Sequence, residues 1–205
     1  EPFAAIMLAR AYRDSGEIGL ATEALRQGVA RAPQTPVLSM ALTEALLYSE
    51  QFDEAKQTLE KLAASKEFPQ QTALFSAFLA AAANQWAEVE TLCKSNAGAF
   101  YPLSFRLLHT AALLKNGKAA EAAEPLLNAE GSPIVSPSTS VLLKVLGKSE
   151  AELAADDETL ATALSASVEG QAVLAYGLAC REARLMQRAY VEFDGLDAQI
   201  PAKPR

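Results

Sequence analysis

Five prolines recur at a nearly constant spacing, and this spacing constrains the fold more than any other feature of the chain. The intervals between them are 34, 33, 33 and 35 residues. Each proline precedes an apolar stretch with helical patterning, and proline is favoured at the first position of a helix, where its missing N–H costs no hydrogen bond. The series consists of Pro2, Pro36, Pro69, Pro102 and Pro137. A regular period of this length predicts an array of repeated helical units.

A polar break follows each of the first four prolines after 14 or 15 residues, at Gly16, Gln51, Asn84 and Gly117. Gly and Asn tolerate the left-handed backbone conformation with which helices often end. Each unit is therefore predicted to be a helix, a tight turn and a second helix. Composition agrees, because alanine is abundant and β-branched residues are sparse, which favours helices. No stretch alternates apolar and polar residues as a half-buried strand would.

The first unit shows the pattern inside one repeat. Small residues stand among large apolar ones at Leu8, Ala9, Tyr12, Gly16, Ala21, Leu25 and Pro33. This pattern resembles the tetratricopeptide repeat, in which two helices pack closely where both carry a small residue. The resemblance implies that the two helices of the first repeat approach each other most closely at Ala9 and Ala21.

The resemblance implies an all-α fold, a single α-solenoid domain over residues 1–205 with about six helix-turn-helix repeats in a right-handed superhelix. Another array of helical hairpins is the structural alternative. The predicted repeats are 2–35, 36–68, 69–101, 102–136, and the degenerate 137–169 and 170–203. In 137–169 we expect a shortened first helix and an irregular or split second helix, which Ser149 and Glu152 could open as a capping box.

The resemblance also implies a binding surface, since the first helix of each such repeat lines a concave groove where a peptide or a partner helix lies. The register gives these candidates: Arg10, Arg13, Met40, Glu44, Leu47, Tyr48, Leu74, Phe78, Leu107, Leu114 and Arg181. The middle of this set is apolar, which favours an apolar or helical ligand. The alternative is that these residues pack against a neighbouring unit, a second copy of the chain, or a terminal segment folded back into the groove.

The residues that carry chemistry are few. His109 is the only histidine, and Cys93 and Cys180 follow no metal-ligand spacing. Because no catalytic motif is present, we predict no catalytic residue, no metal site and no cofactor, and a protein that is not an enzyme. The net charge of −7 argues against nucleic-acid binding. The most apolar stretch, 73–83, is too short to span a membrane.

The first functional hypothesis is a non-enzymatic scaffold that binds a protein or peptide partner in its groove. The partner could present an apolar helix, and it could also be a second copy of the chain. Two alternatives stay open: a chaperone or assembly factor of a bacterial secretion or envelope system, and the docking part of a larger enzyme. The chain begins at Glu1 rather than at a methionine, which leaves an upstream segment open. The choice between cytoplasm and periplasm is open as well.

Overall fold

The computed structural model describes residues 2–98, 101–149, 155–165, 167–185, 188–189 and 191–193. These residues are mainly helical and include no β-strand, apart from one isolated bridge between Leu127 and Pro133. The predicted all-α class is therefore confirmed. The chain divides into two compact units, residues 1–83 and residues 84–205, and each is described by itself.

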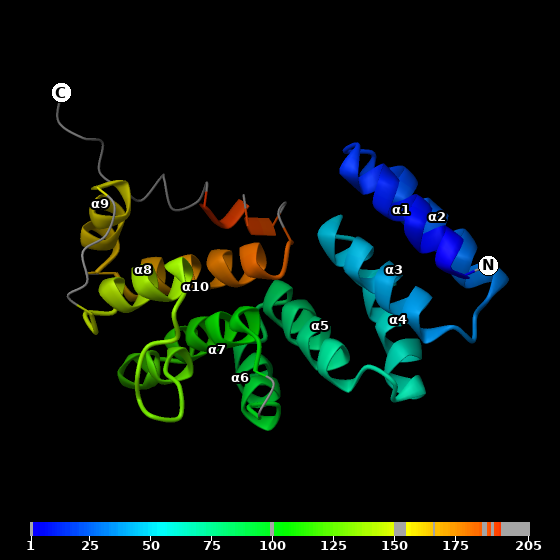
Figure 1. Cartoon of the computed structure of the whole chain (residues 1–205). Coiled ribbons are helices and arrows are strands. Elements are labelled where there is room, and N and C mark those ends of the chain that lie inside the picture. Colours follow the sequence, from blue (N-terminus) through cyan, green and yellow to red (C-terminus); the bar gives the residue numbers. More distant parts are fainter. Residues whose placement is uncertain are drawn as a thin grey trace. The chain divides into compact units, whose positions relative to one another are not determined.

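The first unit is a row of helical hairpins (Figure 1). Its helices are α1 (Pro2–Asp14), α2 (Ile18–Arg31), α3 (Pro36–Tyr48), α4 (Phe52–Ser65) and α5 (Pro69–Ala82). The α1 helix pairs with α2, and α3 pairs with α4. The second helix of each pair also packs on the next first helix, α2 on α3 and α4 on α5. This is the sequential packing that the proline period predicts.

Close helix packing in the first hairpin uses the small residues that the sequence singles out. Ala9 of α1 and Ala21 of α2 are both 5% exposed. Gly28, further along α2, is also buried. A side-chain methyl group at residue 28 would come closer to Ala5 of α1 and Leu38 of α3 than van der Waals contact allows, so small residues set the spacing of these helices.

Prolines begin the helices as predicted, with one exception. Pro36, Pro69 and Pro137 lie in the first turn of their helices, and Pro2 is the first residue of α1. Pro102 lies one residue outside α7 (Leu103–Lys115), in extended backbone with ψ 155°. The proline ring therefore leads into that helix without being part of it.

The residues that precede Pro36 and Pro137 differ as helix caps. Ser136 accepts a hydrogen bond from the backbone N–H of Thr139 and so caps the following helix. Thr35 occupies the corresponding position before α3, but its side chain makes no capping hydrogen bond. Thr35 therefore lies at the N-cap position without capping the helix through its side chain.

Left-handed residues end the first helices of the hairpins. Gly16, Asn84 and Gly117 have positive φ angles of 82°, 57° and 77°, as the polar breaks predict. Gln51 lies in the break between α3 and α4, as predicted, and the left-handed residue of that break is Glu50, with a φ of 56°. The left-handed residue lies two positions after the helix end, and α3 ends at Tyr48.

The second unit is built around two helices that are buried on nearly all sides. It contains α6 (Trp86–Ser95), α7, the short 3₁₀ helices η1 (Ala119–Glu121) and η2 (Glu124–Leu126), α8 (Pro137–Val145), α9 (Ala155–Leu164) and α10 (Val168–Glu182). The α7 helix packs against α6, η1, η2 and α10, and its contact with α10 is the most extensive in the unit. A helix that is apolar all round belongs in the interior.

The predicted second helix of repeat 102–136 does not form. Two 3₁₀ turns and a loop take its place. The physical reason is Pro125, which would fall in the interior of a helix starting near Ala119. There its ring would remove a backbone hydrogen bond and clash with the preceding turn, at a cost of about 3 kcal/mol.

Repeat 137–169 has the shortened first helix that the sequence predicts, since α8 has nine residues. The α9 helix follows as its second helix and packs on α8. Glu152 lies outside the described residues, and with it the proposed capping box. The second half of repeat 170–203 also lies mostly outside them. The α10 helix packs chiefly on α7 and only slightly on α8, which differs from a strictly sequential stack.

Candidate functional site

The predicted groove residues of the first unit lie on helices that are neighbours. The α1 helix contacts α3, and α3 contacts α5, so the three first helices lie in a row (Figure 1). Of the predicted residues on these helices, two are exposed and four are half-buried. We call these six the first-helix face: Arg10 and Arg13 (exposed), and Met40, Glu44, Tyr48 and Leu74 (half-buried).

Two other predicted residues of this unit belong to the core. Leu47 and Phe78 are each 2% exposed, so neither side chain offers a surface to a partner in this structure. For Leu47 the cause lies in the packing of α3, which contacts α1, α2, α4 and α5. A helix with neighbours on so many sides buries apolar residues on more than one face.

An ion pair joins two helices across the first-helix face. Arg13 Nη1 of α1 lies 3.8 Å from Glu44 Oε1 of α3, and both side chains are 42% exposed. An exposed pair of this kind contributes about 0–1 kcal/mol. Its main effect is to balance the charge of Glu44, so that the middle of the face is neutral while Arg10 remains at its edge.

In the second unit the predicted groove positions are covered. Leu107 and Leu114 of α7 are 0% and 3% exposed, and α10 packs along α7. Both residues therefore pack against other parts of the same chain, and here the alternative to ligand binding describes the structure. These two residues therefore have no free surface within residues 84–205.

Arg181 is exposed and connects α10 to α8. Its Nη2 donates a hydrogen bond of 2.8 Å to Ser138 Oγ. Ser138 in turn donates to Glu182 Oε1 at 2.5 Å. The guanidinium group thus has a structural partner within its own unit, and its predicted role toward a ligand remains a prediction.

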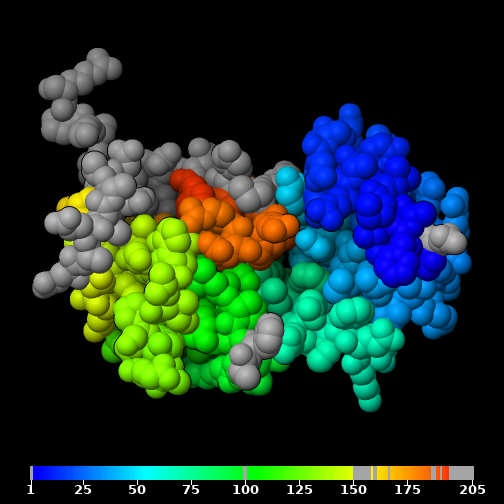
Figure 2. Space-filling model, viewed as in Figure 1, coloured from blue at the N-terminus to red at the C-terminus, as the bar shows by residue number. Residues whose placement is uncertain are grey.

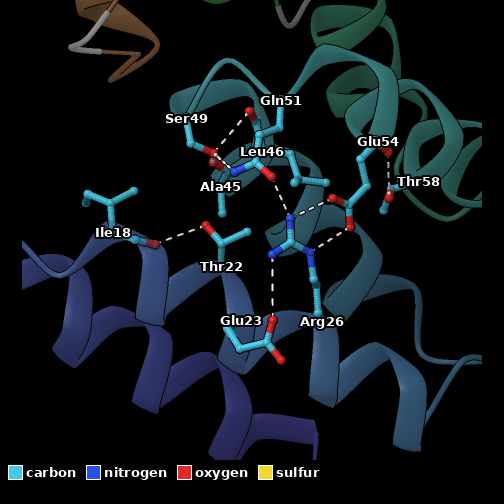
Figure 3. A network of polar contacts seen from close by, with 10 residues as sticks. All are labelled: Ile18, Thr22, Glu23, Arg26, Ala45, Leu46, Ser49, Gln51, Glu54 and Thr58. Carbon is cyan, nitrogen blue, oxygen red and sulfur yellow. Dashed lines mark hydrogen bonds and ion pairs between the residues drawn. The ribbon is translucent and has the colours of Figure 1, made fainter.

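A polar network that the sequence did not single out joins the first two hairpins (Figure 3). Arg26 of α2 donates to both carboxylate oxygens of Glu54 of α4, at 2.8 and 2.6 Å. It also donates to Gln51 Oε1 at 2.5 Å. The hydrogen bond with Arg26 lowers the pKa of Glu54. Such a bidentate pair fixes the second helix of one repeat to the next repeat.

The second unit has a counterpart with the charges reversed. Glu90 of α6 accepts hydrogen bonds from Lys118 and Lys94, both at 2.6 Å, and from Asn116 at 2.7 Å. These donors, with Lys118 first in effect, lower the pKa of Glu90 to about 2. In both networks a charged residue on the second helix of one repeat has a partner of opposite charge 28 residues later in the chain. This spacing of opposite charges is the sequence signal that could have predicted them.

A cleft of about 340 Å³ lies beside the 3₁₀ turns that replace the missing helix. Its walls include Tyr101, Arg106 and His109. The Tyr101 hydroxyl lies 2.8 Å from His109 Nδ1. Arg106 stacks 4.7 Å from the centre of the Tyr101 ring and donates to the carbonyl oxygens of Tyr101, Pro125 and Leu127. Arg106 therefore ties the loop to α7.

Three titratable groups in and next to this cleft, His109, Cys93 and Tyr101, are held neutral. Burial lowers the pKa of His109 to about 4, and burial raises the pKa of the Cys93 thiol to about 12. Burial also raises the pKa of Tyr101. A general base works best with a pKa near the operating pH, and a cysteine nucleophile needs a lowered pKa. This group of side chains therefore supplies neither at neutral pH.

Three further findings are absences. Within the described ranges, no three His, Cys, Asp or Glu side chains gather closely enough to hold a metal ion. No helix in the part of the chain that the structure describes has the length and apolar character needed to cross a membrane. Comparisons with protein-family models, with curated proteins and with solved structures find no match.

Proposed function

We propose that this protein is a scaffold of the tetratricopeptide-repeat type that binds a segment of a partner protein on the first-helix face of residues 1–83. The observation that carries the proposal is a row of neighbouring first helices whose predicted groove residues keep exposed surface. Six of the eight predicted residues in this unit do so.

The chemistry of the face supports a ligand with apolar side chains. Met40, Glu44 and Tyr48 follow one another at intervals of four residues, so they form one stripe along α3. Methionine adapts its shape to irregular apolar surfaces, and tyrosine combines an apolar ring with a polar tip. Leu74 of α5 extends the apolar surface onto the neighbouring helix.

Charge sets the orientation of such a ligand. Arg13 neutralises Glu44 in the middle of the face, which suits uncharged side chains there. Arg10 is exposed on α1, and it can bind an acidic group at the end of the same segment. The proposed partner is therefore a short segment with apolar residues followed or preceded by a carboxylate.

Selection from a random peptide library displayed on phage tests the proposal. Peptides selected on the wild-type protein should carry apolar residues, and Tyr48→Ala and Met40→Glu should each weaken their binding at least about tenfold, a change of about 1.4 kcal/mol. Val135→Ala is the matched control, because Val135 is apolar and fully exposed in the other unit. Peptides that bind the two face variants as tightly as wild type would contradict the proposal, provided circular dichroism shows intact folding.

A further inference from the structure

The cleft of the second unit lies beside the 3₁₀ turns that replace the second helix of repeat 102–136. Its walls come from the end of α6, from α7 and from the segment 121–129, which contains η2. The η2 turn packs on α7, and the yellow-green residues that follow it lie beside the green part of the unit in the space-filling view (Figure 2). The volume of about 340 Å³ falls within the range of ligand pockets, about 300–1,000 Å³.

His109 lines this cleft and has a hydrogen-bonding group without a partner. The residue is 8% exposed, and its Nε2 is buried without a hydrogen bond to any residue that the structure describes. Buried polar groups nearly always have a partner, because an unpaired one costs the free energy of its lost hydration. A molecule in the cleft can supply the partner that the protein does not.

The other ring nitrogen of His109 decides which kind of partner Nε2 needs. The Tyr101 hydroxyl lies 2.8 Å from Nδ1. A phenol hydroxyl is more acidic than the N–H of a neutral imidazole, so the hydroxyl donates and Nδ1 accepts. Burial lowers the pKa of His109 to about 4, and a neutral imidazole carries one N–H. That hydrogen is therefore on Nε2, which needs a hydrogen-bond acceptor.

The Tyr101 ring that orients His109 is itself held on two sides. Its edge-to-face contact with Phe105 has a distance of 5.5 Å between ring centres. The guanidinium group of Arg106 lies 4.7 Å from its centre and is fixed by the carbonyl oxygens of Pro125 and Leu127. A donor that is fixed before the ligand arrives loses little conformational freedom on binding.

The charges around the cleft cancel. Lys94 and Arg106 supply two positive charges, and Glu121 and Glu124 supply two negative ones. A charged ligand of either sign would meet like charges, which disfavours its binding. The apolar lining residues are Ala97, Leu113, Pro125, Leu127 and Ala129.

We propose that this cleft binds a small uncharged molecule with an apolar body and a carbonyl oxygen, which accepts a hydrogen bond from Nε2–H of His109. The apolar body packs against the apolar lining residues, and the carbonyl oxygen satisfies the buried donor. The site is independent of the first-helix face, which belongs to the other unit.

Nuclear magnetic resonance of the imidazole nitrogens tests the donor. His109 is the only histidine in the chain, so protein labelled with ¹⁵N-histidine gives the signals of this ring alone. We expect a neutral ring with its hydrogen on Nε2 at pH 7. A ring with its hydrogen on Nδ1 would overturn the proposal, because Nε2 would then be an acceptor.

Three probes with the same phenyl ring test the ligand class. Acetophenone carries a carbonyl oxygen, ethylbenzene lacks the oxygen, and benzoate adds a negative charge. We expect acetophenone to shift the Nε2 signal saturably and to bind at least about tenfold more tightly than either of the others. Equal binding of the three, tighter binding of benzoate, binding that leaves the Nε2 signal unchanged, or no saturable binding of acetophenone would each contradict the proposal.

Two substitutions show whether acetophenone occupies this cleft. Ala97→Trp places a large ring on an exposed wall residue of the cleft, and we expect it to weaken acetophenone binding at least about tenfold. Ala87→Trp is the matched control, because Ala87 is an exposed residue of α6 that does not line the cleft, and it should leave the affinity unchanged. Unchanged affinity in Ala97→Trp would overturn the proposal.

Removal of the donor completes the test. In His109→Leu, the affinity for acetophenone should fall to that for ethylbenzene, because only the apolar contacts remain. A variant that folds and keeps the wild-type affinity would contradict the role of His109. If His109→Leu does not fold, the signal of Nε2 in the wild-type protein and the pair of tryptophan variants decide the question.

Discussion

Replacement of Gly28 by alanine tests the packing of the first hairpins in a single substitution. A Cβ atom at this residue would lie 2.7 Å from Ala5 Cβ and 3.3 Å from Leu38 Cδ2. Carbon atoms in contact prefer separations of about 3.5–4.0 Å. Ala5 Cβ is held by its own backbone and cannot rotate away, so α1 and α2 must move apart. Gly19 is a matched control in the same helix, because no described atom lies within 4 Å of the corresponding position.

The expected magnitudes have opposite signs. Alanine in place of glycine favours a helix by about 1 kcal/mol or less, and at Gly19 only this gain applies. At Gly28 the overpacking costs about 1–3 kcal/mol. We therefore expect Gly28→Ala to lower the free energy of unfolding by up to about 2 kcal/mol, and Gly19→Ala to raise it by about 0.5–1 kcal/mol.

Urea unfolding followed by far-ultraviolet circular dichroism measures both changes. A second substitution sharpens the test, because Ala5→Gly removes the nearer of the two contacting carbons. In the Gly28→Ala background, Ala5→Gly should be less destabilising than in wild type by about 1 kcal/mol, which a double-mutant cycle resolves. If Gly28→Ala stabilises the protein as much as Gly19→Ala, the close approach of α1 and α2 described above is wrong.

Three further predictions concern the buried polar groups of residues 84–205. The pKa of His109 in the folded protein, about 4, lies below the usual value, so the free energy of unfolding should fall by up to roughly 3 kcal/mol as pH drops from about 6.5 toward 4. His109→Leu should flatten this part of a plot of the urea unfolding midpoint against pH. An unchanged slope in the variant would contradict the lowered pKa of His109. Glu90→Gln should lower the free energy of unfolding at pH 7 by about 1–3 kcal/mol. In wild type the contribution of Glu90 should disappear between about pH 4.5 and 2, because its folded-state pKa is depressed; thermal unfolding against pH shows both effects. Cys93 and Cys180 are buried and should react with a disulfide reagent only after unfolding, so that rapid reaction of the native protein would refute their burial.

Features that act through a residue's own backbone are predictable from the sequence. Proline restricts φ and lacks an N–H, and Pro36 and Pro69 begin helices where they stand. Glycine and asparagine accept a positive φ, and Gly16 and Asn84 end helices. Pro125 disfavours a helix over residues 119–126 for the same local reason. The prediction of a helix there followed the repeat period and did not take Pro125 into account.

Features that depend on which surfaces meet required the tertiary structure. Apolar residues around α7 indicate that the helix is buried, but not that α10, far along the chain, is the helix that packs on it. For the same reason the sequence did not separate Leu47, which is in the core, from Tyr48 next to it, which is half-buried. Proline and glycine act within a single turn of chain, so the sequence by itself determined where most helices begin and end and the period at which they recur. Burial is the sum of contacts from distant segments, so only the packed structure decided which residues of each helix remain free to bind.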